Sequence, residues 1–172
     1  MDKTTPKDEL PMPEGSNFAE NRVLAVDLDG TLVRSDLLYE TMWSGLSKRP
    51  LDTLRAVLSQ EGGRAGLKRR VAANADLDFT RLPYNEDVLD YVRRWRETGG
   101  RVVLVTAAEQ VLADAVAAHL GLFDDVHGSD GVRNLKGAEK AAFLTETYGT
   151  YTYMGDAAAD VPVWDGAERI VT

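Results

Sequence analysis

Three short apolar runs in this chain each end in polar residues, and this pattern restricts the fold more than any other feature. The first run, Val23–Val26, leads directly into Asp27. The other two end at Thr106 and, after one glycine, at Asp156. Continuous apolar runs of this length are typical of strands that are buried on both faces of a parallel sheet. The pattern therefore predicts parallel strands that present polar groups at their carboxyl ends.

Helical patterns separate these strands. Residues 85–98 begin with a capping Asn85, carry acidic residues in the first turn, and end with arginines before Gly99, as helix capping and the helix dipole favour. Further helices are predicted over 109–120 and 137–148, and short strands at 125–127 and 169–171. Strands that alternate with helices predict an α/β fold with a Rossmann-like, doubly wound parallel sheet.

Two segments lie outside this alternation. Residues 1–20 hold three of the six prolines and no apolar periodicity, so we expect a flexible tail. Residues 35–82 match no strand pattern and contain three helical stretches separated by Pro50 and by Gly62–Gly63. We interpret them as a small helical cap inserted after the first strand, with residues 21–34 and 83–172 forming the core. A length of 172 residues suits one such domain.

Composition excludes several classes of function. The chain has no cysteine, which rules out disulfides and cysteine catalysis. Its 20 basic and 28 acidic residues give a formal charge of −8, so we expect no nucleic-acid partner. No apolar run reaches the roughly 18 residues that a membrane span needs, and no basic and apolar leader opens the chain. We therefore expect no direct membrane insertion and a cytoplasmic location.

The polar groups at the strand ends are the candidate site. In open parallel sheets, ligands bind at the carboxyl ends of the strands, near the point where the strand order reverses. Several carboxylates in one crevice repel one another unless a cation lies between them, and oxygen donors without cysteine or neighbouring histidine favour Mg²⁺. The residues expected to converge there are Asp27, Asp29, Thr106, Lys136, Asp156 and Asp160.

This set of residues suits phosphoryl transfer. With Mg²⁺ screening its charge, a carboxylate can attack phosphorus and form an aspartyl phosphate that water later hydrolyses. A second carboxylate two residues further on points the same way and can protonate the leaving oxygen. The Thr106 hydroxyl and the Lys136 ammonium would hold phosphoryl oxygens. Lys140, one helical turn after Lys136, is a competing candidate for the cation.

Four ordered motifs resemble those of the haloacid dehalogenase superfamily. They are DLDGT at 27–31, the strand-end Thr106, NLKG at 134–137 and GDAAAD at 155–160. The resemblance implies that Asp27 is the nucleophile and Asp29 the general acid and base. It implies phosphate binding by Thr106, Ala107 and Lys136, Mg²⁺ coordination by Asp27, Asp156 and the backbone carbonyl of Asp29, and an outer-shell role for Asp160. The inserted cap would close over the site and select the substrate.

A narrower resemblance suggests a cellular context. Several longer segments are similar to the domain of this superfamily that is often joined to UbiA-family membrane prenyltransferases. They read DLDGTLVRSDLLYET, RAGLKRR, LPYNEDVLDYV, SDGVRNLKG and DVPVWDGAERIV. This resemblance implies a possible association with a membrane prenyltransferase.

Two basic residues have open interpretations. Lys68, in a basic cluster of the predicted cap, either contacts a second anionic group of the substrate or lies on a solvated helix face. Arg34, just after the first motif, either contacts the substrate or forms a structural ion pair. His119 and His127 lack partners at metal-ligand spacing, so we expect both to be structural.

The function these features favour is Mg²⁺-dependent hydrolysis of a small phosphorylated metabolite. Dehalogenation is disfavoured because Asp29 supplies an acid that suits phosphate esters. Three alternatives stay open. The chain could be a phosphomutase, a receiver-like module whose aspartate accepts a phosphoryl group, or a regulatory or docking module of a membrane prenyltransferase with little turnover.

Overall fold

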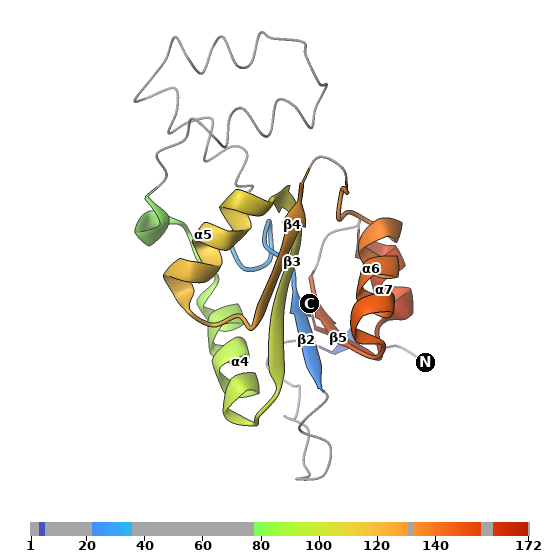
Figure 1. Ribbon diagram of the computed structural model, residues 1–172. Helices are drawn as coiled ribbons and strands as arrows, with labels where there is room; N and C mark the ends of the chain where they lie inside the picture. Colours follow the sequence, from blue (N-terminus) through green and yellow to red (C-terminus); the bar gives the residue numbers. More distant parts are fainter. Residues whose placement is uncertain (1–3, 6–21, 36–77, 131–132, 156–159, 172) are drawn as a thin grey trace, which may run out of the picture.

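A computed structural model describes residues 4–5, 22–35, 78–130, 133–155 and 160–171 (Figure 1). Its strands are β1 (Thr4–Thr5), β2 (Val23–Val26), β3 (Arg101–Glu109), β4 (Asp125–Ser129), β5 (Thr152–Met154) and β6 (Arg169–Val171). They form one parallel six-stranded sheet in the order β1-β6-β5-β2-β3-β4. From β2 the chain moves outward through β3 to β4 and then returns to β5 on the other side of β2. The strand order therefore reverses between β2 and β5.

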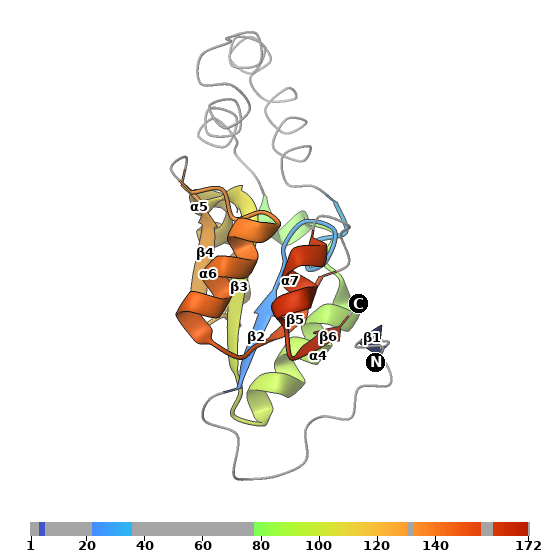
Figure 2. The same ribbon diagram turned by 90° about the vertical axis from the view of Figure 1, so that its right-hand side faces the viewer.

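Helices cover both faces of this sheet (Figures 1 and 2). One face carries α4 (Glu86–Glu97) and α5 (Gln110–Leu120), and the other carries α6 (Ala138–Tyr148) and α7 (Val161–Gly166). A short 3-10 helix, η2 (Phe79–Arg81), precedes α4. No helix within the described ranges is long and apolar enough to cross a membrane. This architecture confirms the predicted doubly wound α/β fold.

The central strand β2 is buried on both faces, as its uninterrupted apolar sequence predicts. Leu24 and Val26 belong to the hydrophobic cluster that includes the inner faces of α4 and α5. Val23 and Ala25 point the other way, into the cluster that includes side chains of α6 and α7. Burying a side chain of this size contributes roughly 1.5–3 kcal/mol. The two clusters hold β2 between the two helical layers. They thereby fix the position of Asp27, the residue that follows β2.

The structure differs from the sequence-based expectation in three places. Thr4 and Thr5 pair with Ile170 and Val171 at the edge of the sheet, although the sequence predicts a flexible tail there, because two residues carry no strand pattern of their own. β3 extends to Glu109, with a register shift against β4 after Val105. The six-residue helix α7 is too short for periodicity to reveal it. Most of the predicted cap lies outside the described residues, so its boundaries stay a prediction.

Candidate active site

Asp27 lies at the carboxyl end of the central strand. Its backbone N–H donates to the carbonyl of Met154 on β5 at 2.9 Å, which continues the pairing of β2 with β5 by one residue. Its side chain is buried, with the residue 6% exposed. Asp27 therefore sits at the point where the strand order reverses, where open parallel sheets bind their ligands.

A tight turn follows Asp27. Gly30 has φ of 82°, a left-handed conformation that favours glycine, and its N–H donates to the Val33 carbonyl at 2.8 Å. The Val33 N–H in turn donates to the Leu28 carbonyl at 2.9 Å. Leu28 is fully buried and Asp29 is partly exposed. The turn thus places one carboxylate inside the site and the second nearer the solvent.

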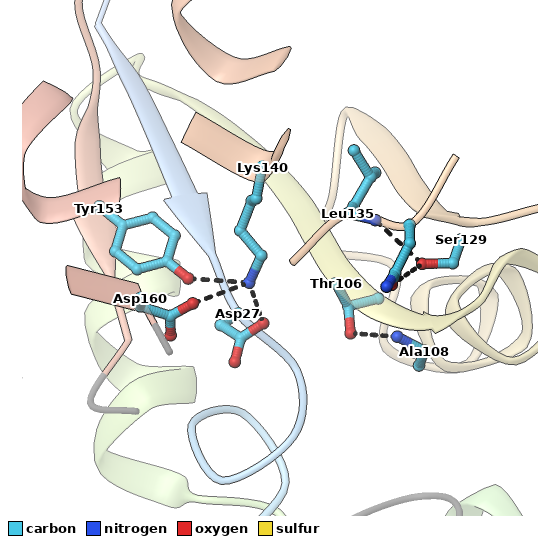
Figure 3. A network of polar contacts seen from close by, with 9 residues as sticks. Asp27, Thr106, Ala108, Ser129, Leu135, Lys140, Tyr153 and Asp160 are labelled. Carbon is cyan, nitrogen blue, oxygen red and sulfur yellow. Dashed lines mark hydrogen bonds and ion pairs between the residues drawn. The ribbon is translucent and has the colours of Figure 1, made fainter. Parts of the chain in front are cut away.

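Lys140 lies at the centre of a buried polar network (Figure 3). Its Nζ donates to Asp27 Oδ1 at 2.7 Å, to the Tyr153 hydroxyl at 3.0 Å and to Asp160 Oδ1 at 3.3 Å. The exposed fractions are 2% for Lys140, 3% for Asp160 and 0% for Tyr153. Charged groups are this deeply buried only when they are paired. The network joins α6, β2, β5 and the start of α7.

The charges in this network do not balance. Among the described residues, one ammonium faces two carboxylates, so their formal charges leave one buried negative charge. Burial raises the pKa of Asp27 above its ordinary value of 3.8, and the charge of Asp160 raises it further, while Lys140 acts in the opposite direction. Burial, followed by the charges of Asp27 and Asp160, also raises the pKa of Tyr153 well above 10.0, so its hydroxyl stays protonated. The site therefore favours an additional cation.

The lysine that meets Asp27 is Lys140, and this corrects the choice of Lys136. Gly137, with φ of 56°, precedes the start of α6 at Ala138. Lys136 consequently lies in the loop before the helix and is exposed. Lys140 lies in α6 one turn before Leu144, and these two residues form the buried face of that helix. The sequence signal is that spacing of four, which places Lys140 on the face that packs against the sheet.

Thr106 lies on β3, the strand next to that of Asp27 (Figure 3). The residue is buried, and its Oγ1 accepts a hydrogen bond from the Ala108 N–H at 3.0 Å. Because the hydroxyl oxygen serves as the acceptor, the hydroxyl proton can be donated to a phosphoryl oxygen. Ala107, between these two residues, is partly buried.

Sequence reasoning missed a second hydroxyl, which fixes the loop before α6. Ser129, at the end of β4, accepts from the Leu135 N–H at 3.1 Å and donates to Asn134 Oδ1 at 3.4 Å (Figure 3). Leu135 is 1% exposed. These contacts fix Asn134 and Leu135, which lie just before α6. This is the helix that carries Lys140.

The other predicted residues have different positions. Arg34 is 60% exposed, with its Nη2 at 3.3 Å from Asn85 Oδ1 and 3.9 Å from Asp87 Oδ2, so its described contacts are structural and tie it to the start of α4. Asp156 and Lys68 lie outside the described residues. His127 bonds through Nε2 to the Tyr148 hydroxyl at 2.7 Å, in keeping with a structural role.

The donors of the site suit Mg²⁺. Asp27 supplies a buried carboxylate, and Asp160 Oδ2 is a buried oxygen without a hydrogen-bond partner. Such oxygen donors are those that Mg²⁺ prefers. Among the residues that the structure describes, no group of three or more His, Asp or Glu side chains could hold a metal ion. Asp156, which the resemblance assigns to the metal, lies outside the described residues, and its role as a ligand stays a prediction.

Most of the chain matches a known family. A family model described as haloacid dehalogenase-like hydrolase matches residues 24–165. The chain belongs to this family. The uncharacterized protein y4nM of Sinorhizobium fredii (strain NBRC 101917 / NGR234) is 40% identical to it over 155 residues. That match covers 90% of this chain and 30% of the relative, so the chain spans about a third of the relative's length.

Solved structures share this hydrolase fold. A protein of unknown function from Bordetella pertussis Tohama I has a TM-score of 0.66 at 17% identity, covering 87% of this chain and 88% of its own. A substrate-bound phosphoserine phosphatase has a TM-score of 0.57 at 17% identity, covering 86% and 83%. A predicted phosphoglycolate phosphatase from Haemophilus somnus 129PT has a TM-score of 0.59 at 16% identity, covering 90% and 85%. At these identities the similarity establishes a shared fold.

Proposed function

We propose that this haloacid dehalogenase-like hydrolase is a Mg²⁺-dependent phosphatase that acts on a small phosphorylated metabolite through an aspartyl phosphate at Asp27. The observation that carries the proposal is the buried Asp27 carboxylate at the strand-order reversal, held by Lys140 Nζ at 2.7 Å. A buried carboxylate with a paired cation is poised to act as a nucleophile once a metal screens it from the phosphate. The fold shared with phosphatases supports the same reaction class.

The proposed reaction has two displacements at phosphorus. In the first, a carboxylate oxygen of Asp27 forms a bond to phosphorus as the bond to the leaving oxygen breaks, and the carboxyl group of Asp29 gives its proton to that oxygen. In the second, the Asp29 carboxylate removes a proton from water as the water oxygen bonds to phosphorus. The bond between Asp27 and phosphorus then breaks, which releases inorganic phosphate and restores the carboxylate.

Three side chains assist these displacements. Lys140 orients Asp27 and offsets part of the negative charge of the incoming phosphoryl group, while Asp160 holds the other side of the ammonium. Thr106 donates its hydroxyl proton to a phosphoryl oxygen. Preorganised donors of this kind stabilise the charge that develops in the transition state.

Mg²⁺ would be held by Asp27 and Asp156, with Asp160 close by. When bound, it supplies positive charge between the nucleophile and the phosphate. The buried excess negative charge and the unpartnered Asp160 Oδ2 support this assignment.

Phosphate release tests the proposal. Metal-free protein is incubated with p-nitrophenyl phosphate and with a panel of sugar, amino-acid and prenyl phosphates, each with and without millimolar Mg²⁺. Asp27→Asn keeps the shape of the side chain and removes the nucleophile, and Asp90→Asn, at an exposed pair with Arg93, is the matched control. We expect Mg²⁺ to switch on hydrolysis in the wild type and in Asp90→Asn and not in Asp27→Asn. Folded wild-type protein that binds Mg²⁺ and hydrolyses none of these esters would contradict the proposal and favour a docking module.

The association with a membrane prenyltransferase rests on the sequence resemblance alone and stays a prediction. Co-purification of the tagged chain with a membrane prenyltransferase would support it. Transfer of the phosphoryl group to a second hydroxyl of the substrate, in place of release to water, would support the phosphomutase alternative.

A further inference from the structure

Tyr153 supplies the third acceptor of the Lys140 ammonium. An ammonium group has three N–H donors, and Lys140 Nζ has three described acceptors, on Asp27, Asp160 and Tyr153, at 2.7, 3.3 and 3.0 Å. Two of these acceptors are carboxylates that attract the same cation from different directions. The Tyr153 hydroxyl is the neutral one and is fully buried in the middle of β5. It therefore sets where the ammonium rests between the two carboxylates.

The position of the Tyr153 ring is tightly determined. A Cβ atom added at Gly155 would lie 2.7 Å from Tyr153 Cε1 and 3.0 Å from its hydroxyl oxygen. Gly155 is not among the glycines with positive φ in the described chain. Glycine is therefore needed at this position because a side chain would collide with the Tyr153 ring, and not because of the backbone conformation. Gly155, the glycine of the GDAAAD segment, and Tyr153 thus form one packing unit, in which the ring fills the space that a side chain at residue 155 would occupy.

We propose that Tyr153 is a positioning residue, whose hydroxyl holds the Lys140 ammonium against Asp27. The inference rests on the proposed phosphatase function and deepens it, because it gives a role to a residue to which the proposal assigns neither the phosphate nor the metal. Without the hydroxyl, one buried N–H of Lys140 loses its partner, and the ammonium shifts toward Asp160 or toward another acceptor. A buried donor without a partner is costly, so the side chain reorients.

Crystal structures of three proteins test the positioning directly. Tyr153→Phe removes the hydroxyl and keeps the ring. Tyr151→Phe is the matched control. Tyr151 lies two residues earlier on the same side of the chain and is 1% exposed. Its hydroxyl donates to the Val163 carbonyl at 3.2 Å and not to the Lys140 network. We expect the distance from Lys140 Nζ to Asp27 Oδ1 to lengthen in Tyr153→Phe and to stay as in the wild type in Tyr151→Phe. An unmoved Lys140 in Tyr153→Phe overturns the proposal, whatever the activity.

Kinetics on the most active phosphate ester give a second readout. We expect Tyr153→Phe to lower kcat roughly 10- to 100-fold, the size of one hydrogen bond to a charged group. Its KM should stay within about twofold of the wild type, and Tyr151→Phe should leave both constants near the wild type. In a Lys140→Met background, Tyr153→Phe should lower kcat no further, because coupled residues act as one unit. Equal losses in both backgrounds would overturn the proposal. A wild type without phosphatase activity but with a displaced lysine in Tyr153→Phe would contradict the proposed function alone.

Discussion

Replacing Lys140 by methionine should destabilise the protein strongly, since it leaves two buried carboxylates without their cation. Lys140 is 2% exposed and pairs with Asp27 at 2.7 Å and with Asp160 at 3.3 Å. Methionine has a similar length, so the change removes the charge and little packing volume. Breaking a buried ion pair by removing one partner costs about 3–5 kcal/mol. For a domain of this size that corresponds to a fall in Tm of about 6–20 °C.

The assay is urea denaturation of metal-free protein, with Lys136→Met as the matched control. Lys136 is exposed, so the free energy of unfolding of that variant should stay within about 0.5 kcal/mol of the wild-type value. Mg²⁺ should restore part of the stability of Lys140→Met, because it supplies positive charge to the same carboxylates. Equal stability of the two variants would refute the reasoning, as would a larger loss in Lys136→Met.

Two further predictions concern a histidine and a threonine. Burial lowers the pKa of His127 below 6.5, with Asp125 acting in the opposite direction. As the pH falls, His127 therefore takes up a proton in the unfolded chain at a higher pH than in the folded protein. The free energy of unfolding should decrease below about pH 6.5. His127→Gln should flatten this dependence in urea titrations across that range, and an unchanged slope would exclude His127 as the cause. Thr106→Val should lower kcat/KM about 100-fold by removing one donor to the phosphoryl group, whereas Thr106→Ser should keep most of the activity. Equal activity of these two variants in a phosphate-release assay would exclude the hydroxyl from the reaction.

The sheet could be predicted because its strands are buried on both faces. Val23–Val26 must be uniformly apolar to pack against helices on either side, and this made the strand and its carboxyl end visible in the sequence. The edge pairing of Thr4 with Ile170 depends on backbone hydrogen bonds, which any residue but proline can make. No side-chain pattern marks it, so it was not predicted.

The site could be predicted only in part. The apolar strand before Asp27 predicts that this residue lies at the carboxyl end of the sheet. The GDAAAD motif predicts that Asp160 belongs to the site, but it does not predict that its side chain is buried. The start of α6 was predicted to within one residue, so it does not explain the choice of Lys136. That lysine was chosen for its NLKG motif, whereas the spacing of four between Lys140 and Leu144 marks the face that packs against the sheet. Tyr153 was missed because a tyrosine in a buried strand is expected to fill space, and only the three-dimensional structure shows its hydroxyl 3.0 Å from Lys140 Nζ.

Trapping the covalent intermediate tests the central claim most directly. The protein is mixed with Mg²⁺ and the most active phosphate ester, or with acetyl phosphate as a general phosphoryl donor, quenched in acid, and digested for mass spectrometry. A phosphoryl group on the peptide that contains Asp27, cleaved by hydroxylamine as an acyl phosphate is and missing from Asp27→Asn, is the predicted result. Ester hydrolysis with no such adduct, or an adduct on another residue, would contradict the account.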